Sequence, residues 1–190
     1  MLYLDDSIGH WSDNEIEFHL SGVSLERQEK IRRYTTTLDK ELSLKSYLLL
    51  QKGLKNKYGI SDPPIFTYNQ YKKPSLIKYP SIHFNLSHCE NAAACYISDH
   101  PVGVDVETID SLDSNFAQYV LNPQEYQQVE LSENPAIEFT LLWTKKESLI
   151  KLIGKGIDEQ SLPNILQNHS SPCQIQDYPW ILLLHPKPYL

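Results

Sequence analysis

Two carboxylates stand two residues apart in the stretch Val102–Glu107, where apolar and other residues alternate. The alternation predicts a strand whose valines share one face, so that Asp105 and Glu107 lie side by side on the other. Like charges this close repel unless a cation neutralises them, and Mg²⁺ would do so with carboxylate oxygens and a substrate phosphate. We expect this face to be exposed, with Gly103 leaving it open to a ligand. The alternative interpretation is two solvated acids on a half-buried strand.

Two further clusters carry groups that could act beside these acids. On one predicted helix, Trp143, Glu147 and Lys151 recur every four residues and therefore share a face. A glutamate on this largely apolar helix is expected to be partly buried and to need a cation, although a surface Glu–Lys pair is the plainer interpretation. A predicted turn contains Ser87 and His88, which could donate hydrogen bonds to an anion or be structural.

The elements that must position these groups fall into two predicted halves. In the first we predict strands at 2–4, 65–68, 82–86 and 92–97, helices capped by Ser24 and Thr37, and an ambiguous segment at 14–20. In the second we predict a strand at 102–107, helices at 115–121, 123–131 and 136–153, and strands at 161–166, 173–176 and 180–184. A break near residues 99–102 divides this α+β chain into the halves 1–100 and 101–190.

Composition excludes several classes of protein. The chain has 190 residues, 41% hydrophobic and 22% charged, which is typical of a globular protein with a core. Its net charge of −7 argues against a general affinity for nucleic acid or for an anionic membrane. No apolar stretch is long enough to span a membrane or to form a signal peptide. Three scattered cysteines indicate neither a zinc site nor a disulfide framework, so we expect a cytoplasmic protein.

Taken together, the segments 84–88, 102–107 and 143–156 resemble the 4'-phosphopantetheinyl transferases, in particular the surfactin-synthetase-activating type. The resemblance implies an α+β fold in which two similar halves form a pseudo-dimer, and hence a monomeric protein. It implies transfer of phosphopantetheine from coenzyme A to a serine of an acyl or peptidyl carrier protein, dependent on Mg²⁺ or Mn²⁺. The other product would be adenosine 3',5'-bisphosphate. The sequence does not say whether the carrier serves lysine, fatty-acid or secondary-metabolite biosynthesis.

The resemblance also assigns roles to individual residues. The metal ligands would be Asp105, Glu107 and Glu147. The coenzyme contacts would be Arg27, Lys30, Ser46, Lys73, Ser87, His88, Asp105 and Lys151. The catalytic groups would be Glu147 as the preferred base, Lys151 against the developing charge, and Glu125 as a further candidate. Basic residues on the helix after Ser24 suit the phosphates of coenzyme A, although a solvated helix face would have the same composition.

Two other functions use the same residues. One is a different Mg²⁺-dependent enzyme that cleaves a pyrophosphate without a carrier protein, and the other is an inactive module that binds coenzyme A or a carrier. The complete set of acids and lysine favours an enzyme over the module. A carrier is expected to dock on the second half, where Phe116, Tyr119 and Val120 supply apolar groups, unless these side chains fill the core.

Overall fold

The structure is a computed structural model, and it describes residues 1–8, 11–156 and 158–168 together with the backbone of 180–186. The first half contains β1 Leu2–Asp5, α1 Asp13–Leu20, α2 Leu25–Arg32, α3 Thr37–Tyr58, β2 Phe66–Tyr68, β3 Pro74–Leu76, β4 His83–Cys89 and β5 Ala92–Ser98. The second contains β6 Gly103–Ile109, α4 Ser114–Val120, α5 Pro123–Leu131, α6 Pro135–Ile153, the 3₁₀ turn η1 Leu162–Asn164, α7 Ile165–Asn168 and β7 Trp180–Pro186. The expected α+β class is confirmed.

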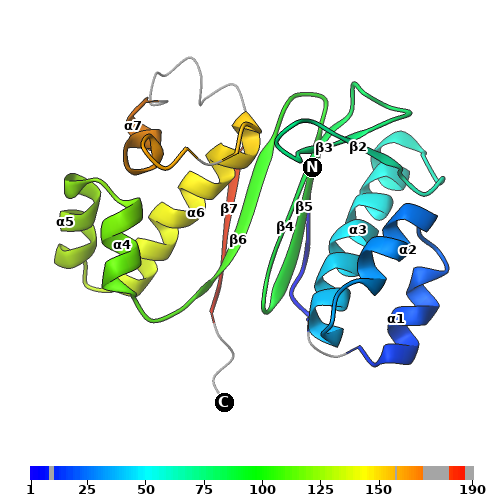
Figure 1. Cartoon of the computed structure of the whole chain (residues 1–190), viewed down its shortest axis with the longest axis horizontal. Coiled ribbons are helices and arrows are strands. Elements are labelled where there is room, and N and C mark those ends of the chain that lie inside the picture. The colour runs from blue at the N-terminus through cyan, green and yellow to red at the C-terminus, as the bar shows by residue number, and fades with distance from the viewer. Residues whose placement is uncertain (9–10, 157, 169–179, 187–190) are drawn as a thin grey trace.

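The strands lie in the middle of the molecule, with the long helices α3 and α6 on opposite flanks (Figure 1). Strands β1, β5 and β4 form an antiparallel sheet in that order, β2 and β3 form a hairpin, and β6 pairs in parallel with β7. Among the described helices, none combines the length and the apolar character that a membrane span requires.

Side chains join the two halves where β4 passes β6. The backbone N–H of Val104 donates to Asn85 Oδ1 at 2.8 Å, and that of Val106 donates to Ser87 Oγ at 3.4 Å. Alternate side chains of β4 thus accept hydrogen bonds from alternate amides of β6, in place of a backbone ladder. This seam fixes the position of Asp105, which lies between the two bonded amides of β6.

The hydrophobic core has one large cluster in each half. The first contains only residues up to position 97, and the second only residues from position 117. A small third cluster of Ala92, Ala94, Val104 and Val106 joins β5 to β6. Helix α6 covers the other face of β6 so closely that a Cβ on Gly103 would lie 2.0 Å from Ser148 O. The expectation that Gly103 leaves this face open is therefore wrong, because the glycine admits the helix rather than a ligand.

Caps set the bounds of the helices that carry functional residues. Thr36, not the predicted Thr37, caps α3, because its side chain accepts a hydrogen bond from the backbone N–H of Asp39. Helix α6 begins after the cap Asn134 and ends at Gly154, whose φ of 67° lies in the left-handed region. The three helices predicted after β6 are all present within two residues of their expected bounds.

Other predictions fail where long-range pairing decides the structure. Ser87 and His88, predicted in a turn, lie inside β4, because this strand pairs with β5 as far as Cys89. In the segment 161–166, predicted as a strand, residues 162–166 belong to η1 and α7. The ambiguous segment 14–20 is helical, and the strand predicted at 173–176 lies outside the described residues.

Candidate active site

Asp105 lies at the centre of a group of charged side chains on β6 and α6. It is only 1% exposed, so the expected exposed position is wrong, and the cause is the coverage of the strand by α6 and β4. Its Oδ1 accepts a hydrogen bond from Ser87 Oγ at 2.8 Å and forms an ion pair with Lys151 Nζ. Its Oδ2 is buried and has no hydrogen-bond partner among the described residues. A buried carboxylate oxygen without a partner costs free energy, so Oδ2 is a natural position for a bound cation.

Lys151 reaches this aspartate from the last turn of α6. Its Nζ donates to Ser87 Oγ at 3.0 Å and lies 3.8 Å from Glu147 Oε2, one helical turn earlier. The predicted shared face of Glu147 and Lys151 is therefore confirmed. Because Ser87 touches both Asp105 and Lys151, strand β4 in the first half helps to hold an ion pair formed by the second half.

The site holds more negative than positive charge. The pKa of Glu107 is raised to about 7, mainly by burial and also by the charges of Asp105 and Glu147, whereas Lys151 and a hydrogen bond from Trp143 lower it. Burial also raises the pKa of Glu147, with Lys151 acting against it. One ammonium among three carboxylates leaves an electrostatic environment that favours a further cation.

The donor set fits a magnesium ion that is shared with a substrate. Within the described ranges, no three His, Cys, Asp or Glu side chains already converge as an all-protein metal site. Mg²⁺ does not need such a cage, because it usually binds one or two carboxylates and completes its shell with phosphate oxygens and water. The unpartnered Asp105 Oδ2 and the raised pKa of Glu107 are the observations that match this requirement.

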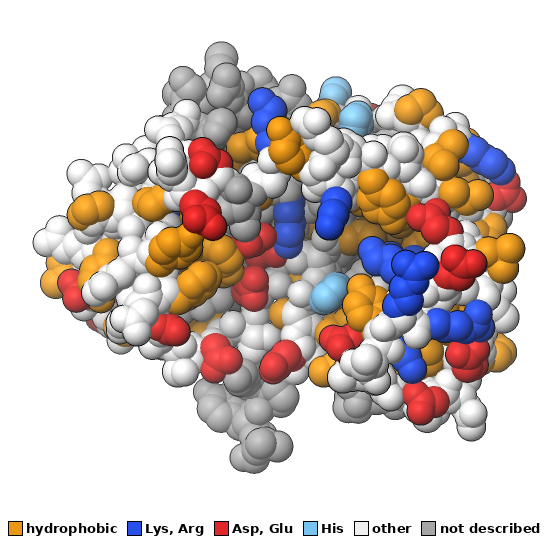
Figure 2. Space-filling model, in the orientation of Figure 1, with side chains coloured by type: hydrophobic (Ala, Val, Ile, Leu, Met, Phe, Trp, Pro, Cys, Tyr) orange, Lys and Arg blue, Asp and Glu red, His pale blue; other side chains and the backbone are white. Residues whose placement is uncertain are grey.

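A cavity of about 210 Å³ opens beside Lys151, between the two halves. It is lined by residues 71–74 around the start of β3, by Asn85 of β4, and by Ile150, Lys151, Gly154 and Gly156 at the end of α6. Figure 2 shows a hollow in the middle of the molecule where acidic and basic side chains face each other. The charged cluster is therefore accessible from a space between the halves, even though Asp105 itself is buried.

The basic residues of α2 differ in whether they can contact a bound anion. Lys30 is exposed and lines a second cavity of about 440 Å³, whose other lining residues are Glu26, Glu29, Arg33, Tyr68 and Lys72. Partial desolvation of its ammonium lowers the pKa of Lys30, and the nearby charge of Arg27 lowers it further. Arg27 is itself buried, where its guanidinium donates to Ser43 Oγ at 2.9 Å and to the Ser43 carbonyl. Lys30 can thus meet an anion directly, whereas Arg27 already has partners.

Two other expected coenzyme contacts, Ser46 and His88, differ in their exposure to solvent. Ser46 is 2% exposed, and its hydroxyl donates to Leu42 O at 2.7 Å within α3, so its donor is already used. His88 has an exposed side chain on β4. Since successive residues of a strand point to opposite faces, His88 points away from the face on which Ser87 meets Asp105.

Glu125 pairs with a lysine that the sequence analysis did not single out. Lys146 is completely buried, and its Nζ lies 2.7 Å from Glu125 Oε2 and donates to Leu162 O and Pro163 O at 3.2 and 2.7 Å. Glu125 also accepts from the N–H of Asn122 in the capping box of α5. These bonds tie α5, α6 and η1 together. Helical spacing could have revealed the buried lysine, because Leu142, Leu149 and Ile150 lie three or four residues from it on the apolar face.

Aromatic side chains lie next to the acidic cluster. The ring of Phe116 meets the ring of Trp143 at 5.0 Å and that of Phe139 at 5.9 Å, both edge to face. Phe116 and Tyr119 are 38% and 52% exposed, whereas Val120 is fully buried. The alternative that these residues fill the core therefore holds for Val120 only.

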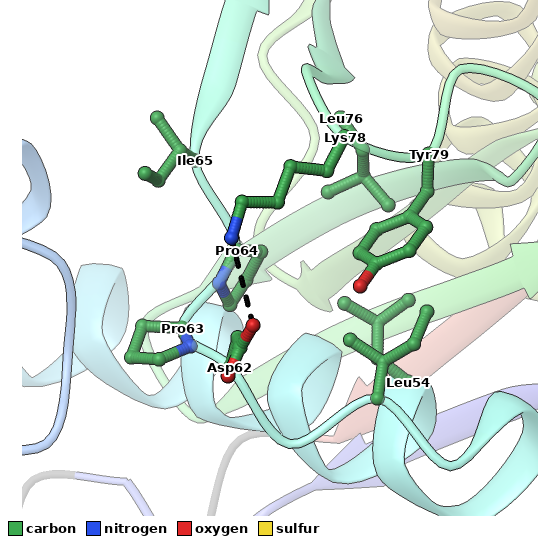
Figure 3. A pocket seen from close by; sticks show the side chains of 9 residues that line it. Leu54, Asp62, Pro63, Pro64, Ile65, Leu76, Lys78 and Tyr79 are labelled. Atoms are coloured by element: carbon green, nitrogen blue, oxygen red, sulfur yellow. Dashed lines mark ion pairs between the residues drawn. The ribbon is translucent and has the colours of Figure 1, made fainter.

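A third cavity lies away from these residues, between the end of α3 and the β2–β3 hairpin (Figure 3). Its volume is about 10 Å³, which is room for about one water molecule. The walls are mostly apolar, and the charged groups at its edge, Lys78 and Asp62, form an exposed ion pair at 3.5 Å. It contributes to packing and offers no acid–base chemistry.

Comparison with known proteins identifies relatives of this chain. Residues 101–183 match the model of the 4'-phosphopantetheinyl transferase superfamily. The chain is 39% identical over 152 residues to the 4'-phosphopantetheinyl transferase gsp of Aneurinibacillus migulanus, a match covering 76% of this chain and 63% of that protein. It is 30% identical over 165 residues to a 4'-phosphopantetheinyl transferase of Bacillus subtilis, covering 85% of this chain and 71% of the relative. It is 28% identical over 193 residues to the 4'-phosphopantetheinyl transferase Sfp of Bacillus subtilis strain 168, covering 93% and 84%.

Proposed function

Because the chain belongs to the 4'-phosphopantetheinyl transferase superfamily, we propose that it transfers phosphopantetheine from coenzyme A to a serine of an apo acyl or peptidyl carrier protein. The products are the holo carrier protein and adenosine 3',5'-bisphosphate. The observation that supports this proposal most is the ion pair between the buried Asp105 and the partly exposed Lys151, with Glu147 beside it, at the edge of the 210 Å³ cavity. Phosphoryl transfer needs mainly positioning and charge stabilisation, and this cluster supplies both kinds of group.

The divalent cation in this proposal, Mg²⁺ or Mn²⁺, would be held among Asp105, Glu107 and Glu147, with one or two of these carboxylates bound to it directly. Once bound with the substrate, it would polarise the pyrophosphate as a Lewis acid. The raised pKa values of Glu107 and Glu147 show that these carboxylates carry a cost of ionisation in the folded protein. A bound cation offsets that cost, so the site gains most from the metal when both glutamates are ionised.

Two side chains of the protein would act on the reaction itself, one by stabilising charge and the other by accepting a proton. Lys151 would stabilise negative charge on the leaving phosphate, and its contacts with Asp105 and Ser87 keep its ammonium at the cluster. Glu147 would accept the proton of the attacking serine, directly or through water. The pKa of Glu147 is raised towards neutral pH, and a general base works best when its pKa lies near the pH of the reaction. Glu125 is less suited to this role, because it is paired with Lys146.

Coenzyme phosphates would be bound mainly by the first half. Lys30, exposed in the 440 Å³ cavity, is the leading candidate for a direct contact, and His88 is exposed as well. Arg27 would contribute indirectly, by joining α2 to α3 through its hydrogen bonds to Ser43, whereas the hydroxyl of Ser46 is used within α3. Ser87 would act at the metal side, through its bonds to Asp105 and Lys151.

The carrier protein would dock over α4, beside the acidic cluster. Phe116 is partly exposed and packs on Trp143, which in turn hydrogen bonds Glu107. Tyr119 extends the same helix surface. Only Trp143 separates this apolar surface from the proposed metal ligand Glu107. A carrier protein bound there would have its serine close to the pyrophosphate.

The two halves, 1–100 and 101–190, would form a pseudo-dimer within one monomeric chain. Separate hydrophobic clusters and one long helix packed on the strands of each half support this arrangement. The expectation of a cytoplasmic protein stays a prediction.

Incubation of the protein with an apo carrier, coenzyme A and Mg²⁺ would distinguish the three functions considered. A carrier that gains the mass of phosphopantetheine, with equimolar release of adenosine 3',5'-bisphosphate, supports the transferase. Release of nucleotide without a change in carrier mass would indicate a pyrophosphate-cleaving enzyme. Binding of coenzyme A or carrier with neither product would indicate an inactive module. Fatty-acid, peptide and polyketide carriers should be compared in parallel.

A further inference from the structure

Lys73 reaches the last turn of α6 from the tight turn between β2 and β3. Its Nζ donates to the carbonyl oxygens of Lys151 at 2.6 Å, Leu152 at 2.9 Å and Val102 at 3.4 Å. The carbonyls at a helix C-terminus lack partners within the helix and carry partial negative charge, so an ammonium is a favourable cap for them. The three hydrogen bonds that the ammonium donates therefore go to backbone groups of the second half.

The turn that carries Lys73 is built to hold it there. Asn69 Oδ1 accepts hydrogen bonds from the backbone N–H groups of Tyr71 and Lys73, both at 2.9 Å, and Asn69 Nδ2 donates to Gly154 O at 2.9 Å. Lys72 has a φ of 65°, which is a costly conformation for a lysine. The turn thus contacts the end of α6 through two side chains.

Gly154 makes room for this contact from the other side. Its φ of 67° ends α6 in the left-handed region, and a Cβ at this position would lie 2.5 Å from Lys73 Cδ. The glycine therefore serves both as the helix cap and as the space through which the lysine stem passes.

We propose that Lys73 is a positioning residue, which fixes the last turn of α6 and so keeps Lys151 on Asp105. The residue whose carbonyl receives the shortest of these hydrogen bonds, Lys151, is the one whose ammonium meets Asp105 and Ser87. The turn containing Lys73 also lines the 210 Å³ cavity, so the wall of the substrate space is joined directly to the catalytic helix. This inference rests on the proposed function and replaces a direct phosphate contact with an indirect role.

The test compares Lys73→Met with Lys155→Met. Methionine keeps most of the stem of Lys73 but removes the ammonium, whereas the control removes a positive charge from the exposed residue just after α6 and leaves the hydrogen bonds intact. We expect Lys73→Met to lower kcat about tenfold or more with a KM for coenzyme A within about threefold of the original, since an interaction that orients Lys151 acts on the reaction step. Lys155→Met should keep both constants. A KM for coenzyme A that rises about tenfold in Lys73→Met, with kcat unchanged, overturns the proposal in favour of a direct phosphate contact.

Amide hydrogen exchange gives a second measurement that needs no activity. In Lys73→Met, the amides of residues 150–154 should exchange at least about tenfold faster, while those in the middle of α3 keep their protection. Unchanged exchange at 150–154 overturns the proposal. If the original protein proves inactive with every carrier, the proposed function fails, yet this exchange experiment still decides the role of Lys73.

A milder variant covers the case in which Lys73→Met does not fold. Asn69 is exposed, so Asn69→Ala loosens the turn without creating a cavity in the core. It should produce the same loss of kcat and of amide protection in smaller measure. No effect of Asn69→Ala on either quantity would contradict the inference.

Discussion

Ser87 Oγ lies between Lys151 and Asp105, accepting a hydrogen bond from the lysine at 3.0 Å and donating one to the aspartate at 2.8 Å. The serine belongs to the first half of the chain, and the ion pair belongs to the second. The geometry of these two hydrogen bonds therefore depends on how the two halves are aligned. Any shift between β4 and β6 would disturb the ion pair.

Asp105→Asn should lower the rate of transfer by at least about a hundredfold, because a lost metal ligand forfeits several kcal/mol of transition-state stabilisation. The substitution keeps the side-chain volume at a position that is 1% exposed, and Lys151 retains Glu147 nearby. Thermal unfolding should therefore stay cooperative. Steady-state kinetics and circular dichroism on the same preparation check this prediction, and turnover near the original rate would contradict the metal assignment.

Glu107 should make the stability of the metal-free protein fall as pH rises. Its pKa of about 7 in the folded protein lies above the ordinary value of 4.5, so between these values the folded protein holds a proton that the unfolded chain has lost. As the pH rises from about 5 to about 8, the melting temperature of the original protein should therefore fall relative to that of Glu107→Gln. A difference that does not change with pH would show that the carboxyl titrates normally.

Mg²⁺ should counteract this loss of stability. A cation binds the ionised carboxylates only, so Mg²⁺ should raise the melting temperature of the original protein more at about pH 8 than at about pH 5. Glu107→Gln should show a smaller rise. Equal rises at both pH values, or in both proteins, would place the ion elsewhere.

Glu125→Gln should act on stability more than on catalysis. It leaves the fully buried Lys146 without its ionic partner, and breaking a buried pair in this way costs about 3–5 kcal/mol of unfolding free energy. Urea unfolding measures that loss, and Lys146→Met combined with Glu125→Gln should recover part of it. If Glu125→Gln instead keeps its stability and loses about a hundredfold in kcat, Glu125 is the general base.

Phe116→Ala and Tyr119→Ala should raise the KM for the carrier protein about tenfold, with the KM for coenzyme A unchanged. Both side chains are partly exposed, so their loss should cost less stability than Val120→Ala, which truncates a buried residue. Leu131→Ala is the matched control, because this leucine is 78% exposed at the end of α5. A similar change in carrier KM for Leu131→Ala would show that the effect of the aromatic residues is not specific.

Local signals in the sequence were sufficient to predict most of the helices. The bounds predicted for α5 match those observed, because Pro123 marks its first turn, and the structure adds an Asn122–Glu125 capping box at the start of this helix. The shared face of Glu147 and Lys151 follows from helical spacing alone.

Predictions that depend on contacts between distant segments were less successful. An alternating pattern identifies β6 but cannot show that α6 covers its second face, so it does not predict the burial of Asp105. Lys73 contacts Lys151 and Leu152, which follow it in the chain by 78 and 79 positions, and no local sequence signal predicts these contacts. Such contacts depend on how the halves pack, and the sequence of either half does not specify them.

The most direct test of the account is the mass of an apo carrier protein after incubation with coenzyme A. Four reactions should be compared: the original protein and Asp105→Asn, each with Mg²⁺ and with a chelator. We predict that the carrier gains one phosphopantetheine group with the original protein and Mg²⁺, and that the other three reactions leave it almost unmodified. Equal modification in the presence of the chelator, or by Asp105→Asn, would contradict the claim that a cation held at Asp105 promotes the transfer.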